Sequence, residues 1–278
     1  MTARPAMPSQ PQLHWSDAAF HWDRYGPPLR PAPEDIRAME ALVRGMPAPR
    51  VLMLGVTPEI ATMGWPAGTR LHAVDRSRPM LERVWPGDLA HRSSERADWL
   101  ELRWGEVRYD VIIGDGILPL LAYPGECRTL VAGIRRGLAD GGIFVTRHFL
   151  QATRREAPAA VFADLLGKRI GSFDAFKMRL AMAMQDDAAT GVRVGDVFAA
   201  WEDAPIDRGA LLAATGWPSG TLETIRPWAG KDARLAFASE EEMASLMGEV
   251  FDALPPRVGR YELAERCPVV GYRPRPQG

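Results

Sequence analysis

Residues 50–77 read RVLMLGVTPEIATMGWPAGTRLHAVDRS, two apolar runs separated by a glycine turn and a spacer, the second ending in an acid. Residues 51–54 are an uninterrupted apolar run, which is typical of a strand buried on both faces of a parallel sheet. Gly55 follows directly, where a glycine lets the backbone turn tightly and approach a ligand. A second apolar run, residues 71–74, ends at Asp75. An acid about twenty positions after such a glycine binds ribose hydroxyls in nucleotide-binding α/β folds, so the sequence predicts an adenosine-containing ligand.

The residues after Gly55 argue against a ligand that carries phosphate. Neither G-x-G-x-x-G nor G-x-x-x-x-G-K-[ST] occurs there. Glu59 stands near the start of the following helix, where its charge would repel a pyrophosphate. S-adenosylmethionine fits better, because it has no phosphate and its positive sulfonium tolerates nearby acids. The same residues disfavour a nicotinamide oxidoreductase.

Strands and helices are predicted to alternate as far as Phe149, which favours a doubly wound, mostly parallel α/β sheet. The expected strands are residues 50–54, 70–74, 91–96, 109–114 and 141–147. The expected helices are residues 34–45, 58–63, 78–84 and 117–138. Beyond Phe149 the pattern predicts helices at 158–168, 172–185, 194–202, 209–217 and 240–250, with final strands near 258–263 and 267–272.

Four motifs stand in order at ordinary spacing: LGVTPE (54–59), AVDRS (73–77), DVIIGDG (110–116) and LADGGIFVTRHF (138–149). Together they resemble the class I S-adenosylmethionine-dependent methyltransferases, over roughly residues 50–149. This chain looks most similar to a subgroup of small methyltransferases with GVTPE as the first motif. The resemblance implies a Rossmann-like methyltransferase sheet, with a helical insertion after its fifth strand, and S-adenosylmethionine as cofactor.

The first motif departs from the family pattern at three positions. Met53 stands where the family usually has an acid, and Thr57 and Glu59 replace the second and third glycines. These changes keep open an alternative from another class, a non-catalytic protein that binds S-adenosylmethionine or S-adenosylhomocysteine on a methyltransferase scaffold.

The sequence predicts four parts. Residues 1–34 form an N-terminal arm, disordered over 1–12, and residues 35–149 form the cofactor-binding core. Residues 150–237 form a helical insertion, and residues 238–278 return to the core sheet. Since insertions after the fifth strand lie beside the ligand-binding edge of such sheets, the insertion is predicted to be a substrate lid, or otherwise a structural or dimerisation subdomain.

The resemblance implies roles for particular residues of the cofactor site. Asp75 would bind the ribose hydroxyls, or else cap the helix that starts near Arg78. Asp98 would accept a hydrogen bond from the adenine amine, with Trp99 beside the ring. The predicted cofactor-binding residues are Gly55, Val56, Thr57, Asp75, Arg76, Met80, Asp98, Trp99, Asp115, Gly116, Tyr25 and Arg30.

Three strand-end residues are the candidates for catalysis. Asp115 would hold the methionine amine or orient the substrate, or cap the next helix. His148 would be a general base, since its ordinary pKa lies near neutrality, or a structural residue. Arg147 would bind a substrate carboxylate or phosphate, or form an internal salt bridge.

The aromatic arm and one insertion helix also leave alternatives open. Trp15 and Trp22, with Tyr25 and Arg30, would either close over the cofactor or pack on the core. The methionines at 178, 182 and 184 are expected in the core of the insertion rather than in a substrate pocket.

The implied reaction is methyl transfer to a small-molecule acceptor by in-line displacement, which needs positioning more than a dedicated base. The chain has 278 residues, 46% of them hydrophobic, enough for one sizeable core with an insertion. A net charge of −1 gives no electrostatic case for nucleic acid. Cys127 and Cys267 are too few for a disulfide framework or a zinc site, so no metal and a reduced, cytoplasmic setting are expected. No apolar run or leader pattern predicts a membrane span or signal peptide, and a monomer or homodimer is expected.

Overall fold

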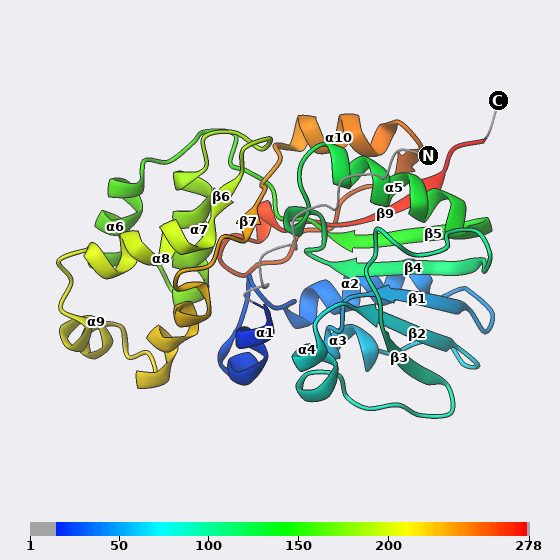
Figure 1. Cartoon of the computed structure of the whole chain (residues 1–278), viewed down its shortest axis with the longest axis horizontal. Coiled ribbons are helices and arrows are strands. Elements are labelled where there is room, and N and C mark those ends of the chain that lie inside the picture. The colour runs from blue at the N-terminus through cyan, green and yellow to red at the C-terminus, as the bar shows by residue number, and fades with distance from the viewer. Residues whose placement is uncertain (1–14, 277–278) are drawn as a thin grey trace, which may run out of the picture.

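The computed structural model describes residues 15–276 and contains a seven-stranded sheet in the order β3-β2-β1-β4-β5-β9-β8 (Figure 1). The strands are β1 (Arg50–Leu54), β2 (Arg70–Asp75), β3 (Arg92–Arg96), β4 (Tyr109–Asp115), β5 (Leu138–Arg147), β8 (Phe251–Ala253) and β9 (Val269–Pro274). The first five pair in parallel, whereas β9 runs antiparallel to β5 and to β8. The predicted parallel α/β sheet is confirmed. The disorder predicted for residues 1–12 lies outside the described residues.

Helices cover both faces of the sheet, as the two-sided burial of β1 requires. They are α2 (Pro33–Val43), α3 (Pro58–Ala61) and α4 (Arg78–Arg83) on one face, and α5 (Gly125–Gly137) and α10 (Glu240–Gly248) on the other. Val51 and Met53 pack on the first face, and Leu52 and Leu54 on the second. This alternation follows from the two-residue period of a strand. In the part of the chain that the structure describes, no helix has the length and apolar character needed to cross a membrane.

A second layer of helices lies beside the sheet, on the left of Figure 1. It comprises α6 (Pro158–Leu166), α7 (Phe173–Met184), α8 (Val194–Asp203), α9 (Arg208–Thr215), the 3₁₀ segment η3 (Ser219–Trp228) and the short pair β6 (Val192–Arg193) and β7 (Arg234–Leu235). These elements share a hydrophobic core of their own, in which the rings of Phe173, Phe176 and Trp201 pack together. The four helices expected at these positions are present, and the domain boundaries stay predictions.

The N-terminal arm lies between this layer and the sheet. It consists of α1 (Trp15–Ala18) and the 3₁₀ segment η1 (Ala19–Arg24). Toward the sheet, the Ser16 hydroxyl lies 3.3 Å from that of Ser77. Toward the helical layer, Asp17 pairs with Lys231 at 2.8 Å. The arm therefore connects the two parts of the molecule.

Two predicted elements are wrong, each for an identifiable reason. The helix expected over residues 117–138 is interrupted, because prolines remove a backbone donor and disfavour helix in the residue before them. A 3₁₀ turn, η2 (Leu118–Leu120), precedes Pro124, and α5 begins after it. The strand expected near 258–263 is absent, because Tyr261 turns its hydroxyl to Arg147 and Leu263 adopts a left-handed φ of 66°. Tertiary contacts override strand propensity there.

Candidate active site

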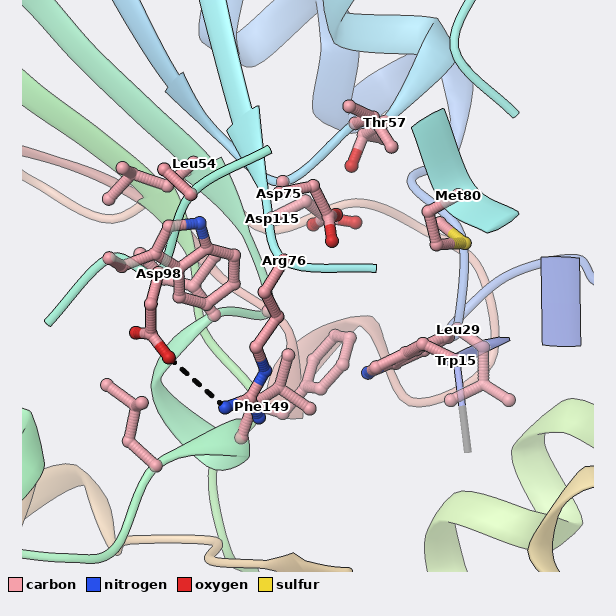
Figure 2. A pocket seen from close by; sticks show the side chains of 18 of the residues that line it. Trp15, Leu29, Leu54, Thr57, Asp75, Arg76, Met80, Asp98, Asp115 and Phe149 are labelled. Atoms are coloured by element: carbon pink, nitrogen blue, oxygen red, sulfur yellow. Dashed lines mark ion pairs between the residues drawn. The ribbon is translucent and has the colours of Figure 1, made fainter. Parts of the chain in front are cut away.

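A cavity of about 800 Å³ opens at the carboxyl ends of β1, β2 and β4 (Figure 2). This edge of an α/β sheet is where ligands bind. It is lined by Trp15, Trp22, Leu29, Leu54, Gly55, Val56, Thr57, Asp75, Arg76, Met80, Ala97, Asp98, Trp99, Asp115, Gly116, Ile117, Leu120, Leu121 and Phe149. We call this space the cofactor cavity. All the residues predicted to bind a cofactor line it except Tyr25 and Arg30.

Gly55 forms the turn beneath this cavity. Its φ is 88°, in the left-handed region that favours glycine, and its amide donates to the Val74 carbonyl at 2.8 Å. An added Cβ would lie 3.7 Å from the Trp99 ring and 3.9 Å from an Asp75 carboxylate oxygen. Those distances are ordinary contacts, so the backbone conformation is what requires glycine here.

Asp75 is only 9% exposed and projects from the end of β2. Its Oδ1 accepts a hydrogen bond from the Ser77 amide at 2.7 Å, just before α4. Burial raises the pKa of this carboxyl to about 6, although the Ser77 and Val56 amides and Arg76 oppose that rise. The side chain thus lines the cavity and steadies the turn before α4. It is not the cap of that helix, because the N-cap residue is Ser77.

Asp98 and Trp99 form the wall of the cavity beside β3. Asp98 accepts from the Leu100 amide at 3.0 Å and faces Arg76 at 3.6 Å, the pair dashed in Figure 2. The Trp99 indole donates to the Val74 carbonyl at 2.9 Å, which fixes the plane of its ring. A carboxylate beside a fixed aromatic ring is a suitable surface for a flat heterocycle with an amino group.

Asp115, at the end of β4, is held by the fully buried guanidinium of Arg147. Arg147 donates to both Asp115 oxygens, at 2.6 Å and 3.0 Å. It also donates to the Tyr261 hydroxyl at 3.1 Å and lies 3.5 Å from Asp35. Arg147 therefore forms the internal salt bridge and does not line the cavity, and its alternative role in binding a substrate anion does not fit.

His148 does not fit the role of a general base. It is 2% exposed and does not line the cofactor cavity, and its Nε2 lies 2.7 Å from the Tyr272 hydroxyl. Burial lowers the pKa of the imidazole to about 4. Its side chain is directed into the core under β9, where a substrate has no access. The structural alternative is the one that the geometry supports.

Tyr25 and Arg30 point away from the cofactor cavity. The Tyr25 hydroxyl donates to the Thr224 carbonyl at 2.8 Å. Arg30 donates to a Glu59 carboxylate oxygen at 2.7 Å and to the Trp22 carbonyl at 3.0 Å. Both side chains are engaged in joining segments of the chain, so their predicted contact with a cofactor carboxylate does not fit. The arm contributes Trp15, Trp22 and Leu29 to the cavity instead.

A second cavity of about 510 Å³ adjoins the first, and no sequence motif indicated it directly. Its lining comes from the arm, the turn after β4, the end of β5, α7, η3 and β7. The residues are Trp15, Tyr25, Leu29, Gly116, Pro119, Leu120, Phe149, Met178, Ala181, Trp228, Leu235 and Phe237. Met178, expected in the core, thus also borders open space. The position of Phe149 directly after the fifth strand was the one available signal. No group of three His, Cys, Asp or Glu side chains that could hold a metal ion occurs within residues 15–276.

No protein-family model matches this chain, and no curated protein matches it either. Solved structures do. The CcbJ methyltransferase from Streptomyces caelestis aligns with a TM-score of 0.53 and 18% identity, covering 92% of this chain and 96% of that one. DhpI in complex with S-adenosylhomocysteine aligns with a TM-score of 0.53 and 14% identity, covering 95% of each chain.

A candidate zinc-dependent alcohol dehydrogenase from Rhodobacter sphaeroides aligns about as well, with a TM-score of 0.52 and 12% identity over 93% of this chain and 98% of that one. Proteins with different assigned activities therefore match the same backbone. At such identities the likeness shows the fold, a Rossmann-like sheet of the kind found in methyltransferases, and function has to be argued from the site.

Proposed function

We propose that this protein is an S-adenosylmethionine-dependent methyltransferase that acts on a small-molecule acceptor. One observation carries the proposal. All the residues expected to bind the cofactor except Tyr25 and Arg30 line one cavity at the strand ends, and a second cavity adjoins it. A transferase for two small molecules needs two connected spaces of this kind.

The charges of the cofactor cavity fit this group. Its charged lining residues are Asp75, Arg76, Asp98 and Asp115, three carboxylates and one guanidinium. The guanidinium of Arg76 faces Asp98. A net negative cavity attracts a sulfonium and an ammonium and repels phosphate. When bound, S-adenosylmethionine supplies a methyl group already activated by its sulfonium.

The protein then acts mainly by positioning. Asp75 would accept hydrogen bonds from the ribose hydroxyls, and Asp98 would accept one from the adenine amine beside Trp99. Asp115 accepts from the ammonium, with its own orientation fixed by Arg147. Preorganised groups of this kind contribute to rate without moving during the reaction.

The acceptor provides its own nucleophile. S-adenosylmethionine, when bound, would supply the methyl group to that nucleophile, and any proton released would pass to solvent. His148 is out of reach and Asp115 is held by Arg147, so no described side chain is placed as a free base between the two cavities. Trp15, Leu29 and Phe149 line both cavities, so the junction has apolar walls.

Calorimetric titration of the purified protein with S-adenosylmethionine and S-adenosylhomocysteine tests the proposal, with NADH as control. We expect micromolar affinity for the first two and none for NADH. If neither binds, the proposed cofactor is wrong, and NADH binding alone would favour an oxidoreductase.

The altered first motif supports the second candidate, a non-catalytic binder on this scaffold. Glu59 stands in place of the family's third glycine, and its side chain pairs with Arg30 and does not line the cofactor cavity. Tight binding of S-adenosylhomocysteine, with no methyl transfer to any of a broad panel of amines, thiols and phenols, would favour this candidate.

A further inference from the structure

We infer that the second cavity is the acceptor site and that it binds an uncharged small molecule built on a flat ring system. The inference rests on the proposed function for its link to methyl transfer. We call this second cavity the acceptor chamber, with the lining given above.

The chamber is apolar and aromatic. Five ring side chains from four separate segments line it: Trp15, Tyr25, Phe149, Trp228 and Phe237. The other described lining residues are Gly, Ala, Pro, Leu and Met, and none of them carries a charge. A charged ligand would lose its hydration there without gaining a partner, which is strongly unfavourable. A flat ring instead gains contact with ring faces and edges on several sides.

The titratable group in the lining is Tyr25, and it is not available to a ligand. Its hydroxyl donates a hydrogen bond to the Thr224 carbonyl at 2.8 Å, and burial raises the pKa of that hydroxyl. Behind its ring lies the ammonium of Lys177, 4.4 Å from the ring centroid. That ammonium pairs with Asp174 at 2.7 Å and donates to the Thr224 hydroxyl at 2.8 Å. The nearest buried cation is therefore neutralised and screened from the chamber by an aromatic ring.

The chamber opens to the cofactor cavity past a glycine. Trp15, Leu29, Gly116, Leu120 and Phe149 line both spaces. At Gly116 an added Cβ would lie 2.7 Å from the Phe149 ring, so the absence of a side chain keeps the junction open. Because Asp115 ends β4 and Gly116 follows it, the junction lies where the reacting methyl group is expected. A ring in the chamber can thus present one edge atom to it.

The test compares two ligands with the same rings, 1-naphthylamine and 1-naphthoate, which differ in charge at neutral pH. Each is titrated into the full-length protein, with and without saturating S-adenosylhomocysteine, and tryptophan and probe fluorescence are recorded. We expect at least tenfold tighter binding of 1-naphthylamine. Equal affinity, tighter binding of 1-naphthoate or no binding of 1-naphthylamine would overturn the inference. This comparison needs no variant.

A matched pair of variants tests whether 1-naphthylamine binds in the acceptor chamber. Ala181→Leu on α7 adds bulk to the chamber, whereas Ala183→Leu adds it to the same helix away from the lining. Ala181→Leu should weaken 1-naphthylamine at least tenfold and change S-adenosylhomocysteine affinity less than twofold, and Ala183→Leu should change neither. Unaltered 1-naphthylamine binding in folded Ala181→Leu protein would contradict the assigned site. If 1-naphthylamine behaves as expected and S-adenosylhomocysteine does not bind, the proposed function fails while the ring-binding chamber stands.

Discussion

The two cavities share a junction, but one has a charged lining and the other an apolar lining. The cofactor cavity carries three carboxylates and a guanidinium, and most of its polar residues follow directly after strands of one sheet. The acceptor chamber carries no charged side chain among its described lining residues, which come from the arm, α7, η3 and β7 as well as the sheet. Local sequence order positions the first, and tertiary packing between distant segments creates the second. The two should therefore respond differently to substitution.

The greatest loss of folding stability is expected when the buried ion pairs of Arg147 beside the cofactor cavity are removed. Arg147→Met leaves the buried carboxylates of Asp115 and Asp35 without their cation. Breaking a buried pair in this way typically lowers the free energy of unfolding by about 3–5 kcal/mol. Urea denaturation at neutral pH measures the loss. The matched control is Arg128→Met, whose pair with Glu249 is exposed and should contribute about 0–1 kcal/mol. Equal losses in the two variants would contradict the buried network.

The next prediction concerns the pH dependence of folding stability, to which two buried groups with opposite pKa shifts contribute. The pKa of His148 falls from 6.5 to about 4 on folding, so its burial destabilises the folded state as pH drops through that window. The pKa of Asp75 rises from 3.8 to about 6, so the folded state is stabilised as pH drops from 6 toward 4. At about 1.4 kcal/mol per pKa unit, each contribution is on the order of 3 kcal/mol, and they largely cancel.

His148→Gln should remove the contribution of His148 and leave that of Asp75 and of the other shifted carboxyls in place. Relative to the unaltered protein, the free energy of unfolding of this variant should increase as the pH is lowered from about 6.5 to about 4. Urea denaturation across that range measures it. Methyl transfer should keep its rate and pH profile, since His148 touches neither cavity. A lost or shifted pH profile would restore the general-base role.

Asp75→Asn should weaken binding in the cofactor cavity and leave binding in the acceptor chamber unchanged. Loss of the carboxylate should reduce S-adenosylhomocysteine affinity by about 1–3 kcal/mol, the scale of a hydrogen bond to a charged group. In the unaltered protein the affinity should fall as pH drops below about 6, where Asp75 becomes protonated, and in Asp75→Asn it should not. Binding of 1-naphthylamine should not change. Asp140→Asn, exposed near the opposite end of β5, is the matched control for calorimetry.

The sequence predicted most of the cofactor cavity and little of the acceptor chamber, and the reason is physical. Gly55, Asp75 and Asp115 follow apolar runs whose period identifies strands, and parallel strands end at one edge. Arg147 and His148 also end a strand, but whether such a side chain faces the cavity or the core depends on its partners, Asp115 and Tyr272, which lie far away in sequence.

The chamber shows the same limit more strongly. Met178 lies on a helix whose sequence is apolar on almost every side, and nothing in its periodicity distinguishes the core from the wall of a cavity. Trp228 belongs to a 3₁₀ segment that was not predicted. Tyr25 was expected to reach the cofactor, and its contact with Thr224 joins residues 199 positions apart. Such contacts are set by packing and leave no local pattern.

The substitution with the smallest expected effect lies at the junction, where the charged and the apolar linings meet. Gly116→Ala must hold a left-handed φ of 57° and place a methyl group against the Phe149 ring, whereas Gly141→Ala has a φ of 75° with nothing within 4 Å of the added atom. Both variants should lose roughly 1–2 kcal/mol of folding stability through backbone strain. In Gly116→Ala alone, displacement of Phe149 should weaken 1-naphthylamine and S-adenosylhomocysteine together, each by roughly 1 kcal/mol, about fivefold. Because Phe149 borders both cavities, a variant that weakened one ligand and spared the other would show that the cavities do not share this wall.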